Sequence, residues 1–422
     1  MAADPLSRRD LLTAGGAAAT LFAGGALARR SLPGPDGPTL SGWPMAGADP
    51  AGTCYAPDAE APTDGVAVRW KHRITVTRSD RQPSPVVADG VVFAVLAFEP
   101  ATPIGSSNGE LLAVGAADGE RLGRICRNPL TAAAVAPGRA YRTPTAAVLE
   151  TPTVESPRLV GVDGRPDESG GDNLTRWTAS VDGSPDGSGR VLYGGADPPP
   201  VSVGDRFLAV YRGHLVSVDA SSGAVEWTSD DTLVATRPAV RDGTAYVRGP
   251  EAGIRGYDVT TGEWAAVEVD LPGAPLHLTA TPESLLVAGH GWVADVVDGD
   301  VAWRASFEGG DVPAGPLAVA NGTVYARRPT ASGARLCALD GSDGSVLWVA
   351  DDVAIDTGDF LPAVADGVVA VPTHGSLAGV DPADGSVRWR FEPPLGRCSP
   401  AAIAGDAVYV LVRETLYALE EA

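Results

Sequence analysis

Residues 380–389 read VDPADGSVRW, and this stretch decides the fold. It predicts the end of one strand, a tight turn and the start of a second strand. The two aspartates of the turn can hydrogen-bond their own backbone, its proline fixes φ, and Gly385 supplies φ > 0. After the turn, Val387 and Trp389 alternate with two arginines. That alternation is typical of a half-buried strand.

The same pattern recurs along the chain. Full copies stand at residues 218–227 (VDASSGAVEW) and 339–348 (LDGSDGSVLW), a variant at 257–264 (YDVTTGEW), and a shortened copy at 297–303 (VDGDVAW). The tryptophans that end the five stretches are 37, 39, 45 and 41 residues apart: Trp227, Trp264, Trp303, Trp348 and Trp389. A period of about 40 residues with several strands in each unit is typical of a β-propeller.

Each unit contains four predicted strands, and four antiparallel strands make one propeller blade. We count eight units, but the second, at about residues 143–181, is irregular, so seven blades stay open as an alternative. The last unit, residues 399–422, lacks its outer strand, whereas residues 66–75 (VAVRWKHRIT) form an outer strand without a blade. Pairing these two would close the ring and leave no open sheet edge. The sequence therefore predicts an all-β, eight-bladed β-propeller over residues 66–422, with four-stranded antiparallel blades closed by an N-terminal strand.

The charge of the chain limits its partners. Its 422 residues include 53 Asp and Glu against 32 Lys and Arg, a formal net charge of −21, and Lys71 is the only lysine. This acidic, lysine-poor composition resembles that of halophilic archaeal proteins, whose acidic surface stays hydrated when salt screens the charges. Because no basic patch is present to displace counterions, nucleic acid and anionic lipid are not expected partners.

Residues 1–30 have the features of an export signal. Arg8 and Arg9 stand in the sequence SRRDLL, before a short, glycine-rich apolar run that ends in small residues. This arrangement resembles a twin-arginine signal peptide, and the run is short for a membrane-spanning helix. We therefore expect a secreted protein, extracellular or at the cell surface, with no membrane span beyond this segment.

Residues 31–65 are predicted to be an extended linker rich in Pro, Gly and Ala. Trp43, Met45 and Tyr55 make the linker too apolar to stay free, so we expect it to pack on the folded body. The four cysteines form no metal-binding motif. Cys337 is predicted to be a buried thiol, and one disulfide is allowed among the other three, Cys54, Cys126 and Cys398.

The repeated D-x-x-x-G-x-x-x-W block resembles the tryptophan-docking motif of the PQQ-like β-propellers, a family that includes quinoprotein dehydrogenases and BamB-like scaffolds. The resemblance covers roughly residues 41–422 and extends to exported haloarchaeal members. It implies that the outer-strand tryptophans dock on neighbouring blades, where burial of each contributes about 2–3 kcal/mol. The structural docking residues would then be Trp70, Trp177, Trp227, Trp264, Trp303, Trp348 and Trp389.

The catalytic branch of this family holds PQQ over the ring axis, with a metal ion bound by Glu, Asn and Asp, an Asp base and a disulfide between adjacent cysteines. This sequence has no adjacent cysteines and no C-x-x-C-H haem motif, and none of those catalytic residues matches a position here. We therefore predict no catalytic residues, no metal ligands and no resident cofactor. The chain is expected to be a monomeric binding or scaffold module for a protein or polysaccharide of the cell envelope. Two alternatives stay open: a PQQ- and calcium-dependent alcohol or sugar dehydrogenase, and a propeller hydrolase or lyase with a polar central pocket.

Overall fold

The computed structural model describes most of the chain from residue 40 onward. The described ranges are 40–74, 83–96, 110–126, 132–137, 144–150, 158–164, 175–180, 198–211, 213–250, 253–309, 312–331, 333–355, 360–394 and 396–422. The predicted signal segment, residues 1–30 with Arg8 and Arg9, lies outside them. Within these ranges, no helix has the length and apolarity needed to cross a membrane.

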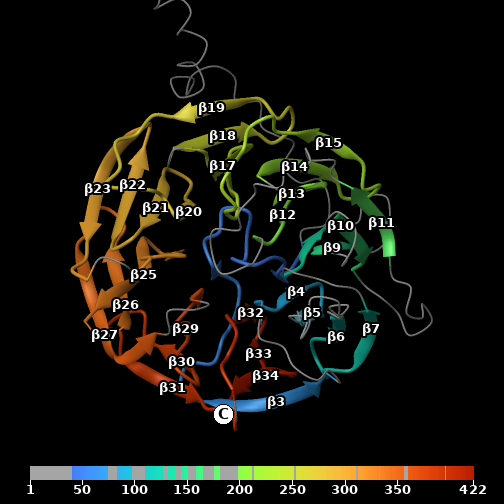
Figure 1. The fold of residues 1–422 in the computed structure, drawn as a ribbon. Coiled ribbons are helices and arrows are strands. Elements are labelled where there is room, and N and C mark those ends of the chain that lie inside the picture. The colour runs from blue at the N-terminus through green and yellow to red at the C-terminus, as the bar shows by residue number, and fades with distance from the viewer. Residues whose placement is uncertain are drawn as a thin grey trace, which may run out of the picture. The chain divides into compact units, whose positions relative to one another are not determined.

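The described strands form eight sheets, and each sheet contains the four antiparallel strands of one propeller blade, which are consecutive in the chain in all blades except the last. Figure 1 shows the blades arranged as a ring, with the first strand of each near the centre and the last at the rim. An eight-bladed, all-β propeller is therefore confirmed, and the seven-bladed alternative is wrong. The blades are numbered here in chain order.

The first four blades use strands in the order in which the chain forms them. Blade 1 consists of β4 (Val86–Ala88), β5 (Val91–Leu96), β6 (Glu110–Gly115) and β7 (Arg121–Cys126). Blade 2 consists of β8 (Ala134–Ala136), β9 (Thr145–Glu150), β10 (Arg158–Asp163) and β11 (Thr175–Ser180). Blade 3 consists of β12 (Val201–Val203), β13 (Arg206–Tyr211), β14 (His214–Asp219) and β15 (Val225–Thr228). Blade 4 consists of β16 (Ala239–Arg241), β17 (Thr244–Arg248), β18 (Ile254–Asp258) and β19 (Trp264–Val267).

Blades 5 to 7 follow the same rule, and blade 8 departs from it. Blade 5 consists of β20 (His277–Ala280), β21 (Leu285–Gly289), β22 (Trp292–Val297) and β23 (Asp300–Ser306). Blade 6 consists of β24 (Ala318–Ala320), β25 (Thr323–Thr330), β26 (Gly333–Asp340) and β27 (Val346–Ile355). Blade 7 consists of β28 (Ala363–Ala365), β29 (Val368–Pro372), β30 (Leu377–Val380) and β31 (Val387–Phe391). Blade 8 consists of β32 (Ala402–Ala404), β33 (Ala407–Val412), β34 (Thr415–Glu421) and the N-terminal strand β3 (Val66–Arg73).

The N-terminal strand β3 closes the ring, as the sequence predicts. It pairs antiparallel with β34, from Val66 opposite Glu421 to Arg73 opposite Thr415. Across this seam, Arg69 forms ion pairs of 2.6 Å with both Asp406 and Glu420. The outer edge of β34 is thereby paired, and so is the edge of β3 that faces it.

Blade 2 begins earlier than the sequence pattern indicates. The pattern places its start near residue 143, and that start is wrong, because the structure adds the inner strand β8 at Ala134–Ala136. The Ala-rich stretch around β8 lacks the proline that marks most other inner strands, so nothing in the pattern separates it from a linker.

Candidate functional site

The ring axis is the first place to look for a site, because a propeller gathers its inner strands there. Most inner strands are short runs of Ala, Val and Ile, such as Ala318–Ala320, Ala363–Ala365 and Ala402–Ala404. The inner strands carry only four polar side chains: Ser202, Arg241, His277 and Thr279. Such small apolar side chains allow close approach of another backbone but offer few groups to a polar ligand.

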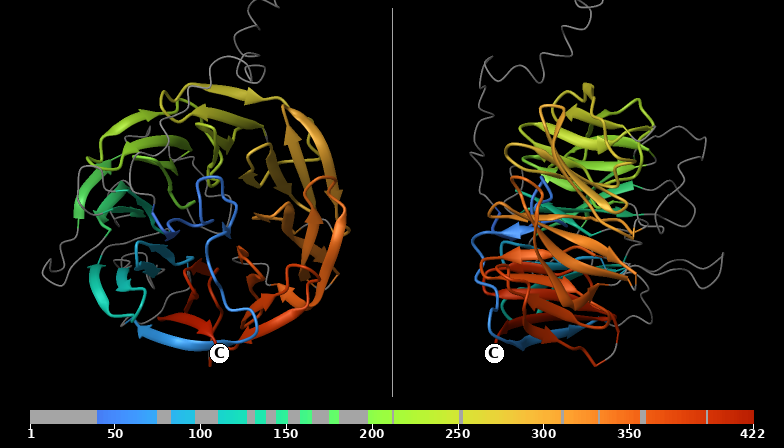
Figure 2. Two further views of the ribbon diagram at one scale, coloured as in Figure 1. Left: turned by 180° about the vertical axis from the view of Figure 1, so that it is seen from behind. Right: turned by 90° about the vertical axis from the view of Figure 1, so that its left-hand side faces the viewer.

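Residues 40–61, here called the axial segment, lie at the centre of the ring (Figure 1). Seen edge-on in Figure 2, the segment lies toward one face of the propeller. Its strand β1 (Gly42–Trp43) pairs antiparallel with β4, and its strand β2 (Tyr55–Ala56) pairs parallel with β28. The segment therefore extends the sheets of blades 1 and 7 toward the axis.

Backbone hydrogen bonds connect the axial segment to further blades. Its carbonyl oxygens accept the amide N–H groups of four other inner strands at 2.8–2.9 Å, which are those of Val135, Val240, Ala280 and Val319. The amide of Glu60 donates to the carbonyl of Gly405 in blade 8 at 2.7 Å. The segment thus satisfies backbone groups of seven of the eight blades, and it covers the axis at one face of the propeller.

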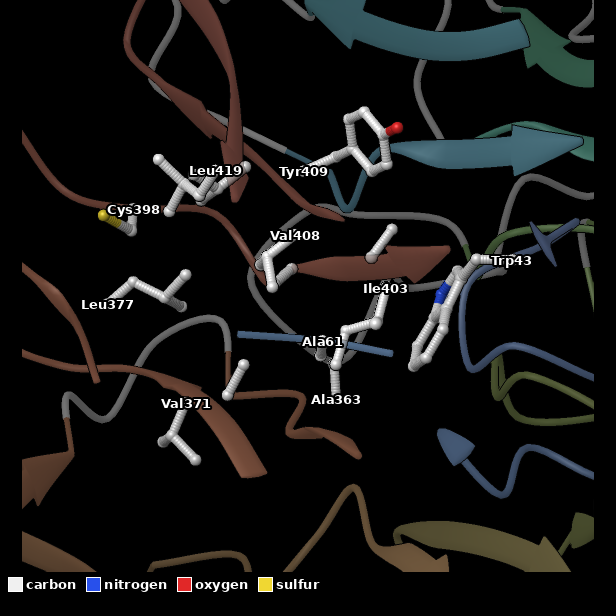
Figure 3. Close-up of a cluster of buried hydrophobic side chains, with 14 of the residues drawn as sticks. Trp43, Ala61, Ala363, Val371, Leu377, Cys398, Ile403, Val408, Tyr409 and Leu419 are labelled. Atoms are coloured by element: carbon white, nitrogen blue, oxygen red, sulfur yellow. The ribbon is translucent and has the colours of Figure 1, made fainter. Parts of the chain in front are cut away.

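Trp43 and Arg237 anchor the axial segment. The Trp43 side chain is fully buried where β1 contacts β4 of blade 1 and β32 of blade 8, and Figure 3 shows it beside Ile403. The Arg237 guanidinium donates to the carbonyl oxygens of Ala46 at 2.8 Å and Asp49 at 2.5 Å. Burial lowers the pKa of Arg237, and the charge of Asp49 opposes that shift.

The residues at the axis do not fit a calcium-bound quinone. The Asp49 carboxylate accepts the backbone N–H groups of Gly52 and Thr53. It is therefore already hydrogen-bonded within the turn of the axial segment. The donors of Arg237 are likewise committed to backbone carbonyl oxygens. Among the described residues, no group of three His, Cys, Asp or Glu side chains is placed to hold a metal ion. A quinone at this end of the axis would have to displace the axial segment.

The outer strands carry a second recurrent arrangement. The turn directly before the outer strand of a blade is here called the docking turn. Six tryptophans donate the indole N–H, at 2.8–3.1 Å, to a carbonyl oxygen of the docking turn in the next blade. They are Trp70, Trp177, Trp227, Trp303, Trp348 and Trp389.

One docking turn was missed by the sequence reasoning. Trp389 donates to the carbonyl of Pro62, which lies in the stretch PTDG directly before β3. This stretch is similar to PADG at residues 382–385, so the N-terminal chain supplies blade 8 with both its outer strand and its docking turn. The PTDG similarity was the signal that could have identified it.

Trp264 does not dock, in contrast to the sequence expectation. Its side chain is 46% exposed, and Arg255 lies over its ring at 4.0 Å from the centroid. Arg255 also forms an ion pair with Asp231. The physical reason is register: Trp264 stands two residues after Gly262 and opposite Tyr257, whereas the docked Trp227 stands four residues after Gly223 and opposite Ser217.

The histidines do not converge on a site in the described part of the chain. His72 and His214 bond backbone carbonyl oxygens through Nδ1, at 3.0 Å and 2.7 Å. Burial, together with the charges of Arg327 and His290, lowers the pKa of His277 to about 3. His277 therefore stays neutral across the physiological range.

Arg327 is a buried cation beside His277. It donates to the carbonyl oxygens of Pro313 at 2.8 Å and Gly315 at 3.3 Å, and it lies over the Phe360 ring at 5.4 Å. Burial lowers the pKa of Arg327 to about 10. Through these contacts Arg327, which belongs to β25, holds the segment that connects blades 5 and 6.

The cysteines are thiols where the structure describes them. Cys337 is a buried free thiol, as predicted, and Cys54 and Cys398 are free as well. A disulfide between Cys54 and Cys398 is therefore absent, and the side chain of Cys126 lies outside the described residues. Burial raises the pKa of all three described thiols to about 12, so they are poor nucleophiles.

The family of the chain follows from comparison with known proteins. A family model described as "Outer membrane protein assembly factor BamB" matches residues 108–291 and 283–419, more than half of the 422 residues. The chain belongs to this PQQ-like β-propeller family. No curated protein matches the sequence.

Solved structures share the fold at low sequence identity. BamB from Moraxella catarrhalis is 14% identical with a TM-score of 0.54, and the match covers 84% of this chain and 97% of that one. A quinohemoprotein alcohol dehydrogenase from Comamonas testosteroni is 14% identical with a TM-score of 0.64, and the match covers 97% and 84%. The computationally designed protein Ika8 is 10% identical with a TM-score of 0.58, covering 86% and 100%. Such likeness shows the fold alone, since one fold hosts several functions.

Proposed function

We propose that this protein is an exported, non-catalytic PQQ-like propeller that acts as a monomeric binding or scaffold module at the cell surface. One observation carries the proposal: the axial segment covers the ring axis at one face and hydrogen-bonds to seven of the eight blades. Its polar groups are committed to its own backbone and to Arg237. A ring closed in this way is a rigid body that presents loops and outer strands to a partner, which is a protein or polysaccharide of the cell envelope.

The composition supports a place outside the cell. The net charge of −21 with a single lysine suits a protein surface exposed to high salt. Arg8 and Arg9 precede an apolar run in the manner of a twin-arginine signal. That route would deliver the propeller with its ring already closed.

We expect the purified, exported protein to show no saturable quenching of tryptophan fluorescence by PQQ at micromolar concentration, with or without calcium, in high salt. The axial segment covers one end of the ring axis, and its backbone groups there are already hydrogen-bonded to the inner strands. Dye reduction with a panel of alcohols and sugars should stay at the background rate. A quinoprotein dehydrogenase freed of its cofactor serves as the positive control. Saturable, calcium-dependent quenching with turnover would overturn the proposal in favour of a quinone-dependent dehydrogenase.

Export is expected to depend on the arginine pair. The double variant Arg8→Lys/Arg9→Lys should accumulate inside the cell as precursor, because the twin-arginine route reads the arginine pair as an address. The matched control is Arg29→Lys/Arg30→Lys, which changes an arginine pair at the end of the segment. Immunoblots of cell and medium fractions measure the result. Normal release of the Arg8→Lys/Arg9→Lys variant would contradict the proposed route.

A further inference from the structure

The guanidinium of Arg327, in strand β25 of blade 6, has one nitrogen that the protein does not use. The residue is only 3% exposed, and its Nη1 atom is enclosed without a hydrogen-bond partner among the described residues. Its other two nitrogens, Nε and Nη2, donate to the carbonyl oxygens of Pro313 and Gly315. The guanidinium is therefore held in one position, with both N–H bonds of Nη1 available to a ligand.

No negative charge of the described residues balances this buried cation. No described carboxylate forms an ion pair with Arg327, and burial is the cause that lowers its pKa. The neighbouring His277 stays neutral and cannot compensate the charge. Since charges inside proteins are as a rule paired, the surroundings of Arg327 lack the counter-charge that its burial requires.

The other described arginines with an enclosed, unbonded nitrogen are in a different situation. Four of them form an ion pair with a carboxylate: Arg124, Arg206, Arg241 and Arg255. The fifth, Arg248, is only partly buried. At the axis, Arg237 uses all three nitrogens as donors and lies near the charge of Asp49. The unpaired charge is thus a property of the surroundings of Arg327.

Access and size limit what the missing partner can be. Because Nη1 has no surface open to solvent, a molecule carrying a carboxylate or phosphate group would have to displace the side chains around it. A single-atom anion needs the least space, and with one charge it loses its hydration at a smaller cost than sulfate does. The Phe360 ring covers the guanidinium at 5.4 Å, and in such apolar surroundings the attraction between the two charges is strong.

We propose that Nη1 of Arg327 binds a chloride ion inside the propeller, beside the segment that connects blades 5 and 6. The ion supplies the negative charge that the described residues do not, and it becomes a structural part of the ring. This inference goes beyond the proposed binding function and does not depend on it, because the site is enclosed and no partner protein or polysaccharide reaches it.

Crystals of the full protein grown in sodium bromide test the site directly. Bromide takes the place of chloride and scatters X-rays anomalously, so an anomalous peak is expected at Nη1 of Arg327. A water molecule at Nη1, or no density there, would overturn the inference.

Thermal melts in sodium chloride and in sodium gluconate, at equal ionic strength, measure the same ion in solution. At a chloride concentration of about 100 times the Kd, binding should raise the Tm by about 3 °C. Arg327→Met should therefore reduce the difference in Tm between the two salts by that amount. The matched control is Arg328→Met, which changes the next residue of β25, a partly exposed arginine on the opposite face of the strand, and should keep the wild-type difference.

A salt difference that is the same in Arg327→Met and in the wild type would contradict chloride binding at this position. If Arg327→Met does not fold, the bromide map of the wild-type protein still decides. Neither measurement involves a cell-envelope partner or a quinone, so a negative result here leaves the proposed function as it stands.

Discussion

Replacing Trp303 by alanine is expected to lower the free energy of unfolding by about 3–5 kcal/mol, whereas Trp264→Ala should change it by less than about 1 kcal/mol. Trp303 is buried, packs on Gly344 and donates its indole N–H to the carbonyl of Gly341 at 2.8 Å. Its loss leaves a cavity between blades 5 and 6 and an unpaired carbonyl. Trp264 is 46% exposed and contributes only its contacts with Arg255 and the neighbouring ring of Tyr257.

Denaturant titrations of the two variants at one fixed salt concentration measure this difference. The salt has to be constant because screening changes the repulsion among the carboxylates of a chain with net charge −21. The two substitutions are chemically identical and lie in adjacent blades, so each is the control for the other. If both variants lost the same free energy of unfolding, docking on the next blade would not be what makes these tryptophans stabilising.

The docking turns could be predicted because their chemistry is local. In the stretch at 380–389, the Asp381 carboxylate accepts the N–H of Ala383 at 2.8 Å. The N–H of Asp381 itself donates to the carbonyl of Ser386 at 2.8 Å, and Gly385 has a φ of +77°. Residue types alone favour these contacts, and their repetition every 40 residues or so is enough to predict the blade. Strand β3 was predictable for the same reason, since its alternation is local and only blade 8 lacked an outer strand.

The arrangement at the axis could not be read from the sequence. The axial segment has no strand periodicity, and its partners lie far along the chain, from Val87 opposite Trp43 to Val364 opposite Tyr55. Arg237 precedes an ordinary inner strand. The residues around it in the sequence do not indicate that its side chain hydrogen-bonds to the carbonyl of Ala46. Such contacts depend on ring geometry, which a local pattern does not contain.

The exposure of Trp264 was also missed, although its signal is visible in the sequence. Trp389 stands four residues after the turn glycine Gly385, whereas Trp264 stands two residues after Gly262. Trp264 therefore has the strand position that the exposed Val225 has in blade 3. Counting residues from the turn glycine would have predicted an exposed side chain.

Replacing Arg237 by alanine is expected to lower the free energy of unfolding by about 3–5 kcal/mol and to open the axial segment to proteolysis. The guanidinium donates to the carbonyl oxygens of Ala46 and Asp49, and each hydrogen bond from a charged donor contributes about 1.5–3 kcal/mol. Gly52 packs on the same guanidinium, since an added Cβ would lie 2.6 Å from its Nη1 atom. Alanine would remove the side-chain donor of the Ala46 carbonyl, leave the Asp49 carbonyl with the N–H of Gly52 at 3.1 Å, and open a gap beneath the turn.

Limited proteolysis followed by mass spectrometry locates the cut, and denaturant titration gives the stability. Arg390→Ala is the matched control: Arg390 is exposed and donates to the Asp352 carbonyl at 2.7 Å, so its loss should cost less than about 1 kcal/mol. Arg237→Lys should fall between the two, because an ammonium group lacks the planar fork that reaches both carbonyl oxygens. If Arg237→Ala kept wild-type stability and an intact axial segment, the backbone bonds to the inner strands would be sufficient to hold the segment. If the segment were released and the ring stayed folded, the same variant would be the one in which to repeat the quinone titration, since the axis would then be open.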